Sequence, residues 1–168
     1  MNTVLKNIEN KMKKNKLSFI EKPLVIGGMA MEYYGMRKAG ADIDLIISDK
    51  DYEILAKMYP DKRKDLFGDL GVIIDEFEIW RSIALLDYNF YKHDAIEEGD
   101  LLMVSIDRLL LMRVFAMDVE KYRKDLNLVK NYYYTTFTNP QFSKEAEIHK
   151  HSYEKNNGVI FSGKYEDR

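Results

Sequence analysis

The chain has 168 residues, a net charge of −2 and a hydrophobic fraction of 46%, which indicates one globular domain with a sizeable core. The slightly acidic balance argues against a general nucleic-acid binder, which usually carries a basic domain. Cysteine is absent, so disulfides and thiolate metal sites are excluded. No apolar stretch has the length of a membrane span or the form of a secretory signal. We therefore expect a cytoplasmic protein without membrane association.

The first third of the chain alternates helical and extended patterns. One extended run ends at Gly27-Gly28, and Ser48 with Asp51 resembles the capping box of a helix start. The expected elements, in chain order, are a helix over 3–16, a strand over 24–26, a helix over 29–35, a strand over 42–47 and a helix over 50–58.

The rest of the chain is strand-poor and then helical. Residues 83–91 are ambiguous. The other expected elements are a loop over 60–71, a strand over 72–80, a short strand over 101–104, and helices over 106–118, 119–134 and 141–153. This order predicts an α+β fold in which helices flank a mixed β-sheet. We expect a core at 1–104, a helical C-terminal part at 105–155 packed on that core, and a flexible tail at 156–168.

Two carboxylates interrupt the apolar run at 42–47. Side chains two apart in a strand point to the same face, so Asp42 and Asp44 project together. Ionised carboxylates at that spacing repel each other and are costly to bury unpaired. Divalent cations relieve that cost, and Mg²⁺ in particular is held by one or two carboxylates together with substrate phosphates. The alternative is a pair of solubilising charges on an edge strand.

Gly27-Gly28 stands where a strand runs into a helix. Glycine lets the backbone approach a ligand closely, and free N–H groups at a helix start suit phosphate. A plain strand-to-helix turn is the other interpretation of the same two residues. Phosphate binding beside metal-binding carboxylates is the combination that phosphoryl or nucleotidyl transfer needs.

These residues resemble the signature of the DNA polymerase β-like nucleotidyltransferase superfamily: a hydrophobic-Gly-Gly segment, a helix, then Asp42-Ile43-Asp44. Two later segments, 105-SIDRLLLMR-113 and 123-RKDL-126, resemble motifs of its small bacterial members. Those members are related to minimal nucleotidyltransferases, type IV toxin–antitoxin nucleotidyltransferases and aminoglycoside nucleotidyltransferases. The resemblance covers about residues 22–130.

The resemblance implies a nucleotidyltransferase fold and transfer of a nucleoside monophosphate from an NTP to an acceptor hydroxyl, with release of pyrophosphate. Asp42, Asp44 and a third carboxylate would hold two Mg²⁺ ions. Glu78 is the best match for the third carboxylate, with Asp75 as the alternative, and Glu78 would also serve as a general base. The acceptor would be a small molecule, a protein or a tRNA end.

Some positions depart from that pattern. Arg37 and Lys38 are candidates to neutralise the triphosphate or are an ordinary solvated turn, and the usual Arg-x-Thr spacing is missing. Arg113 replaces a lysine and is expected at the surface, and Leu128 stands where a second Asp often follows. These departures favour an alternative function: a catalytically inactive protein of the same fold that senses nucleotide or binds a protein partner in a toxin–antitoxin or defence system.

Overall fold

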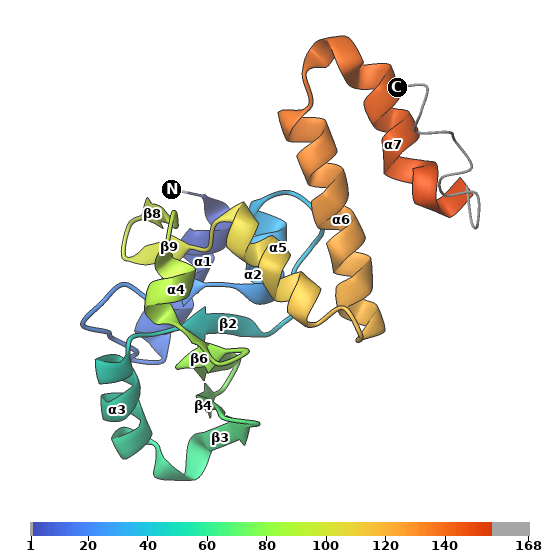
Figure 1. Cartoon of the computed structure of the whole chain (residues 1–168). Helices are drawn as coiled ribbons and strands as arrows, with labels where there is room; N and C mark the ends of the chain where they lie inside the picture. The colour runs from blue at the N-terminus through green and yellow to red at the C-terminus, as the bar shows by residue number, and fades with distance from the viewer. Residues whose placement is uncertain (1, 156–168) are drawn as a thin grey trace. The chain divides into compact units, whose positions relative to one another are not determined.

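The computed structural model describes residues 2–155, with side chains described to residue 150 (Figure 1). The chain divides into two compact units, Met1–Leu126 and a second that begins at Asn127. This division falls inside helix α6 (Glu120–Phe137). The tail expected at 156–168 lies outside the described residues. No helix in the described part of the chain is long and apolar enough to cross a membrane.

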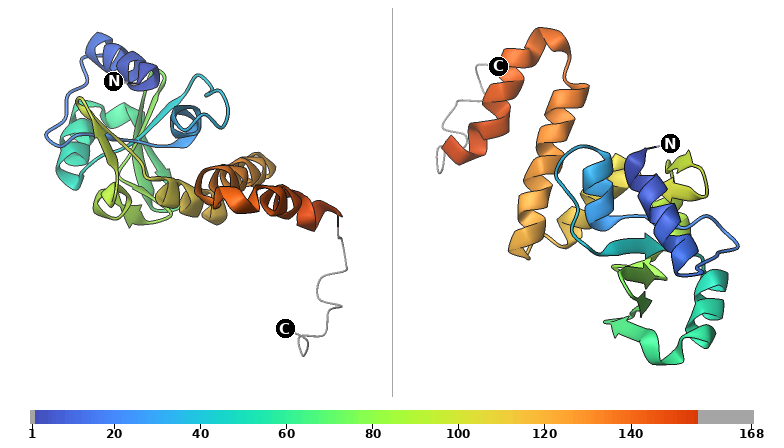
Figure 2. Two further views of the ribbon diagram at one scale, coloured as in Figure 1. Left: turned by 90° about the horizontal axis from the view of Figure 1, so that it is seen from above. Right: turned by 180° about the vertical axis from the view of Figure 1, so that it is seen from behind.

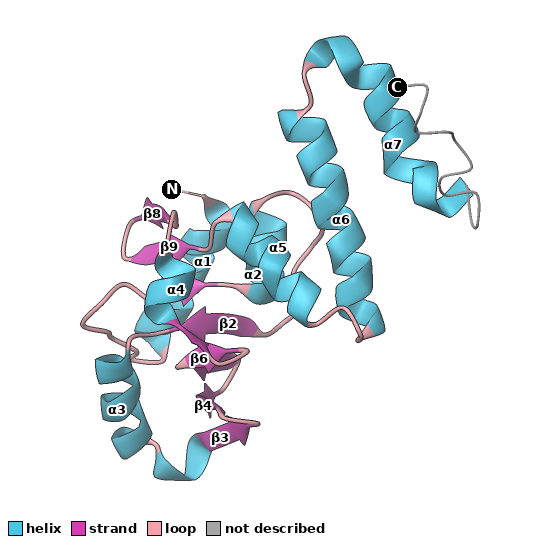
Figure 3. Ribbon diagram, viewed as in Figure 1, coloured by secondary structure: helices cyan, strands magenta, loops and turns pink. Residues whose placement is uncertain are grey.

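A seven-stranded mixed sheet forms the centre of the first unit (Figure 3). In spatial order its strands are β3 (Arg63–Leu66), β4 (Asp69–Ile74), β5 (Phe77–Trp80), β2 (Ile43–Ile46), β1 (Leu24–Val25), β9 (Leu101–Met103) and β8 (Ile96–Glu98). β2 pairs in parallel with β5, and β1 with β9, whereas the other neighbours are antiparallel. A separate small ladder joins β6 (Ser82–Ile83) to β7 (Leu86–Asp87).

Helices flank this sheet (Figure 2). In the first unit they are α1 (Thr3–Lys14), α2 (Gly27–Tyr33), α3 (Asp49–Met58), α4 (Tyr88–Lys92), α5 (Ile106–Phe115) and the start of α6, with a 3₁₀ turn at Pro60–Lys62. α2 packs on both β2 and α1, and α4 packs on β1. The structure confirms the predicted mixed sheet with flanking helices, and the predicted helices and Ser48 cap are present with ends shifted by a few residues.

The central strands are buried, which explains their apolar composition. Ile43, Leu45 and Ile46 of β2 are fully buried, as are Phe77 and Ile79 of β5. Burial of such side chains is the main favourable contribution to folding, at about 1.5–3 kcal/mol each. The half-buried carboxylate of Asp44 therefore lies between fully buried neighbours on β2, and it needs a physical explanation.

Two predictions for residues 60–80 are wrong. The expected loop at 60–71 contains β3 and the start of β4, and the expected strand at 72–80 is a hairpin of β4 and β5. β3 is an exposed edge strand, and its charged composition is typical of a loop. The β4–β5 turn forms without a glycine. Asp75 takes the left-handed conformation there (φ 49°), which Asp tolerates better than most residues.

The second unit is a pair of helices. The remainder of α6 leads through a 3₁₀ turn at Pro140–Phe142 into α7 (Ser143–Lys155). The two helices contact each other through Lys130 Nζ, which donates to Lys150 O at 3.1 Å, and through the stacked rings of Tyr134 and His149. Helices predicted at 119–134 and 141–153 are thus confirmed.

Candidate functional site

Asp44 and Glu78 are direct neighbours on the two central parallel strands. The register of β2 with β5 pairs Asp44 with Glu78, between the apolar pairs formed by Ile43 and Leu45. Paired residues on adjacent strands point to the same face of the sheet. Asp75 lies instead in the exposed β4–β5 turn, so Glu78 is the acidic neighbour of Asp44.

The glycine bend lies directly against the Asp44 carboxylate. Gly27 has φ +63°, and a Cβ added to it would lie 2.1 Å from Asp44 Oδ2. The Ile26 N–H also donates to the Asp44 backbone oxygen at 3.0 Å. Only glycine allows both this backbone conformation and this close approach. The bend and the carboxylate therefore form one local structure, as the order of the two motifs along the chain suggested.

Charge at Asp44 is unfavourable in the folded protein. Burial, then repulsion from Glu78, raises the pKa of the Asp44 carboxyl to about 6; Asp42 adds to the increase, whereas Arg113 and Lys121 oppose it. Within residues 2–150, no hydrogen bond relieves the repulsion at this carboxylate. A half-buried carboxylate beside another carboxylate is a common feature of functional sites.

Asp42 lies just before β2 and is exposed, so it stands at the open end of this acidic group. Its charge contributes to the raised pKa of Asp44, so the two carboxylates interact electrostatically. The donor set of Asp42, Asp44 and Glu78 consists only of carboxylate oxygens, which suits Mg²⁺. Among the described residues, no group of three or more His, Cys, Asp and Glu side chains is placed to hold a metal ion. The donor chemistry suits a divalent cation, and metal binding by these three carboxylates stays a prediction.

Gly28 faces the loop that connects α2 to β2. A Cβ on Gly28 would lie 3.7 Å from Arg37 Nη1 and 3.8 Å from Ala39 Cα. Residues 37–40 thus fold back over the start of α2. The two glycines therefore have close protein neighbours of their own, and any triphosphate contact through them remains a prediction.

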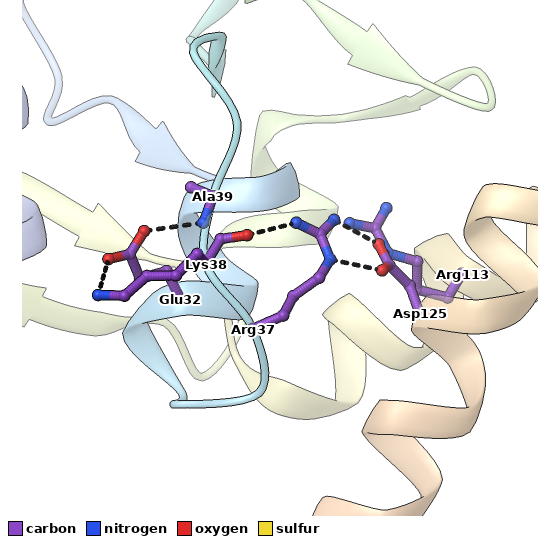
Figure 4. A network of polar contacts seen from close by, with 6 residues as sticks. All are labelled: Glu32, Arg37, Lys38, Ala39, Arg113 and Asp125. Carbon is purple, nitrogen blue, oxygen red and sulfur yellow. Dashed lines mark hydrogen bonds and ion pairs between the residues drawn. The ribbon is translucent and has the colours of Figure 1, made fainter.

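Arg37 is engaged by an aspartate from α6. Its Nε and Nη2 donate to the two oxygens of Asp125 at 2.6 and 2.8 Å, and its Nη1 donates to Lys38 O at 2.9 Å (Figure 4). This bidentate pairing raises the pKa of Arg37. Lys38 is exposed, and its ammonium pairs with Glu32. Both predicted triphosphate ligands thus have carboxylate partners inside the chain.

Arg113 is the candidate residue whose burial was predicted wrongly from the sequence. It was expected at the surface, but only 5% of it is exposed. Its Nε lies 3.2 Å from Asp125 Oδ2 without hydrogen-bond alignment, so their attraction is ionic. Its guanidinium also lies over the ring of Tyr122, and burial lowers its pKa. The signal that sequence reasoning overlooked is its position one turn after Leu109, on the buried face of α5.

Models of known protein families give no match to this chain, and no curated protein matches it.

Proposed function

We propose that this chain is a metal-dependent nucleotidyltransferase that moves a nucleoside monophosphate from an NTP to an acceptor hydroxyl. The observation that carries the proposal is the pairing of Asp44 with Glu78 on adjacent strands, directly against Gly27. Asp42 lies at the exposed end of the same group. Acidic side chains that converge beside a glycine bend are what a site for cations and a triphosphate needs.

The proposed reaction is an in-line displacement. The acceptor oxygen forms a bond to the α-phosphorus, the bond from that phosphorus to the bridging oxygen breaks, and pyrophosphate leaves with the electron pair. Glu78 would take the proton of the acceptor hydroxyl as a general base. Asp42, Asp44 and Glu78 would hold Mg²⁺, which when bound neutralises phosphate charge. Positioning and charge neutralisation would supply most of the acceleration.

The experiment is nucleotide transfer. The purified chain is incubated with each α-labelled NTP, Mg²⁺ and a cell lysate, and the labelled acceptor is identified as a small molecule, a protein or a tRNA end. Asp44→Asn should abolish labelling, whereas Asp61→Asn, at an exposed position outside the acidic group, should leave it unchanged. Wild-type labelling by the Asp44→Asn protein would refute the proposal.

A second function has one observation in its favour. Arg37, which was predicted to contact the triphosphate, is held by both oxygens of Asp125. A catalytically inactive protein of this type would bind nucleotide or a protein partner without transfer, as in a toxin–antitoxin or defence system. NTP- and Mg²⁺-dependent thermal stabilisation, with no labelled product across a broad acceptor panel, would favour this second function.

A further inference from the structure

The loop that delivers Asp42 is anchored at two points. Residues 34–42 connect the end of α2 to β2. On one side Glu32 accepts a hydrogen bond from the Ala39 N–H at 2.8 Å. On the other side Arg37 is held by both oxygens of Asp125. Asp42 is exposed and lies just before β2, so its backbone is held between these anchors on one side and the Ile43 N–H bond to Glu76 O, 2.8 Å, on the other.

Asp125 links three segments of the chain. It is only 3% exposed, and it lies between a guanidinium from the 34–42 loop and one from α5 (Figure 4). Arg37 contributes two short hydrogen bonds, and Arg113 contributes an ionic contact. One buried carboxylate therefore balances two cations, and a buried cation that loses its partner is strongly unfavourable.

Arg113 has its ion pair with Asp125 rather than with the acidic site. Its Nε lies 3.2 Å from Asp125 Oδ2, and Asp125 is the strongest attraction on this guanidinium. The pairing therefore joins α5 to the same carboxylate that holds the 34–42 loop.

We propose that Asp125 is a positioning residue for the acidic site: through its two hydrogen bonds to Arg37 it fixes the loop that carries Asp42. The inference rests on the proposed function, because it concerns cation binding at the same carboxylates. It assigns Arg37 a role in holding the loop, in place of a direct contact with phosphate.

The test uses Mn²⁺ as the probe and the full chain as the protein. Mn²⁺ affinity is measured by electron paramagnetic resonance, and backbone hydrogen exchange is followed over residues 35–42. Asp125→Asn should lower Mn²⁺ affinity about tenfold or more, as loss of a residue that orients metal ligands does. It should also speed exchange in the loop. Lys124→Gln, which changes an exposed neighbour paired with Glu120, should alter neither quantity.

A further variant keeps the inference testable if Asp125→Asn folds poorly. Arg37→Gln leaves Asp125 paired with Arg113, and it should speed exchange in the loop and weaken Mn²⁺ binding.

The outcomes separate the two levels of the argument. A wild-type chain that binds no Mn²⁺ would refute the proposed function, while loop exchange would still decide whether Asp125 fixes the loop. If the wild-type chain binds Mn²⁺ and both Asp125→Asn and Arg37→Gln keep wild-type affinity and loop exchange, the positioning role is refuted alone. A purely structural role for Asp125 would lower stability and leave the Mn²⁺ affinity of the folded protein unchanged.

Discussion

Asp44→Asn should make the metal-free protein more stable at neutral pH. The pKa of Asp44 is about 6 in the folded protein, against an ordinary value of 3.8. A raised folded-state pKa means that the folded protein holds the proton more tightly than the unfolded chain. The contribution of this group to stability is fully present below pH 3.8 and is lost as the pH rises through 6. A shift of about two units corresponds to about 3 kcal/mol.

Asparagine keeps the shape of the carboxyl group and cannot ionise, so it removes this loss. At pH 7 and in the presence of a chelator, we expect Asp44→Asn to raise the free energy of unfolding by about 2–3 kcal/mol. At pH 4 the two proteins should agree within about 0.5 kcal/mol, because the wild-type carboxyl is then protonated in the folded state. Urea unfolding at both pH values measures the difference.

The matched control is Asp61→Asn. It removes the same charge from an exposed side chain outside the acidic group, where a substitution usually changes stability by less than about 0.5 kcal/mol. A destabilised Asp44→Asn protein at pH 7, or an equal gain at pH 4 and pH 7, would show that the charge of Asp44 is not held at a cost. The electrostatic basis of the site would then be wrong.

Three other predictions concern the same region and its supports. Mg²⁺ should raise the melting temperature of the wild-type chain but not of Asp44→Asn, because binding to the folded state alone is stabilising; equal shifts in both would place the cation elsewhere. Gly27→Ala should cost about 1–3 kcal/mol in chemical denaturation, since the new Cβ meets the Asp44 carboxylate at positive φ, whereas Gly28→Ala should cost less because its Cβ would have ordinary contacts. Asp51→Ala should cost about 2–4 kcal/mol in the same assay, because this buried carboxylate accepts bonds from two backbone N–H groups and from Ser48; a loss under 0.5 kcal/mol would contradict that account.

Part of the site was predicted from the strand pattern and part from the family resemblance. Period-two alternation predicted that Asp42 and Asp44 share a face, and the resemblance favoured Glu78 over Asp75 as the third carboxylate. The structure buries Phe77 and Ile79, which flank Glu78, and pairs Glu78 with Asp44. The composition of a strand predicts its burial, because a strand that is covered on both faces of the sheet consists mainly of apolar residues.

Contacts between distant segments left no such local signal. Arg37 and Asp125 are 88 residues apart, and each alone reads as a solvated charge. The prediction for the edge strand β3 was wrong for a local reason. β3 is exposed along its whole length, so its sequence has no apolar periodicity. What the sequence predicted well was local patterning, and what it missed was pairing decided by tertiary structure.

The distribution of charge around Asp44 separates a cation site from a structural ion pair. Arg113 attracts the Asp44 carboxylate and so opposes the rise in its pKa, but the ion pair that Arg113 makes is with Asp125. The fold places Glu78, a second carboxylate, beside Asp44. That arrangement lowers the stability of the metal-free protein, and such strain persists where function needs it. Under the proposed function, a cation from solution would relieve the repulsion between Asp44 and Glu78, and the Mg²⁺-dependent change in melting temperature tests this.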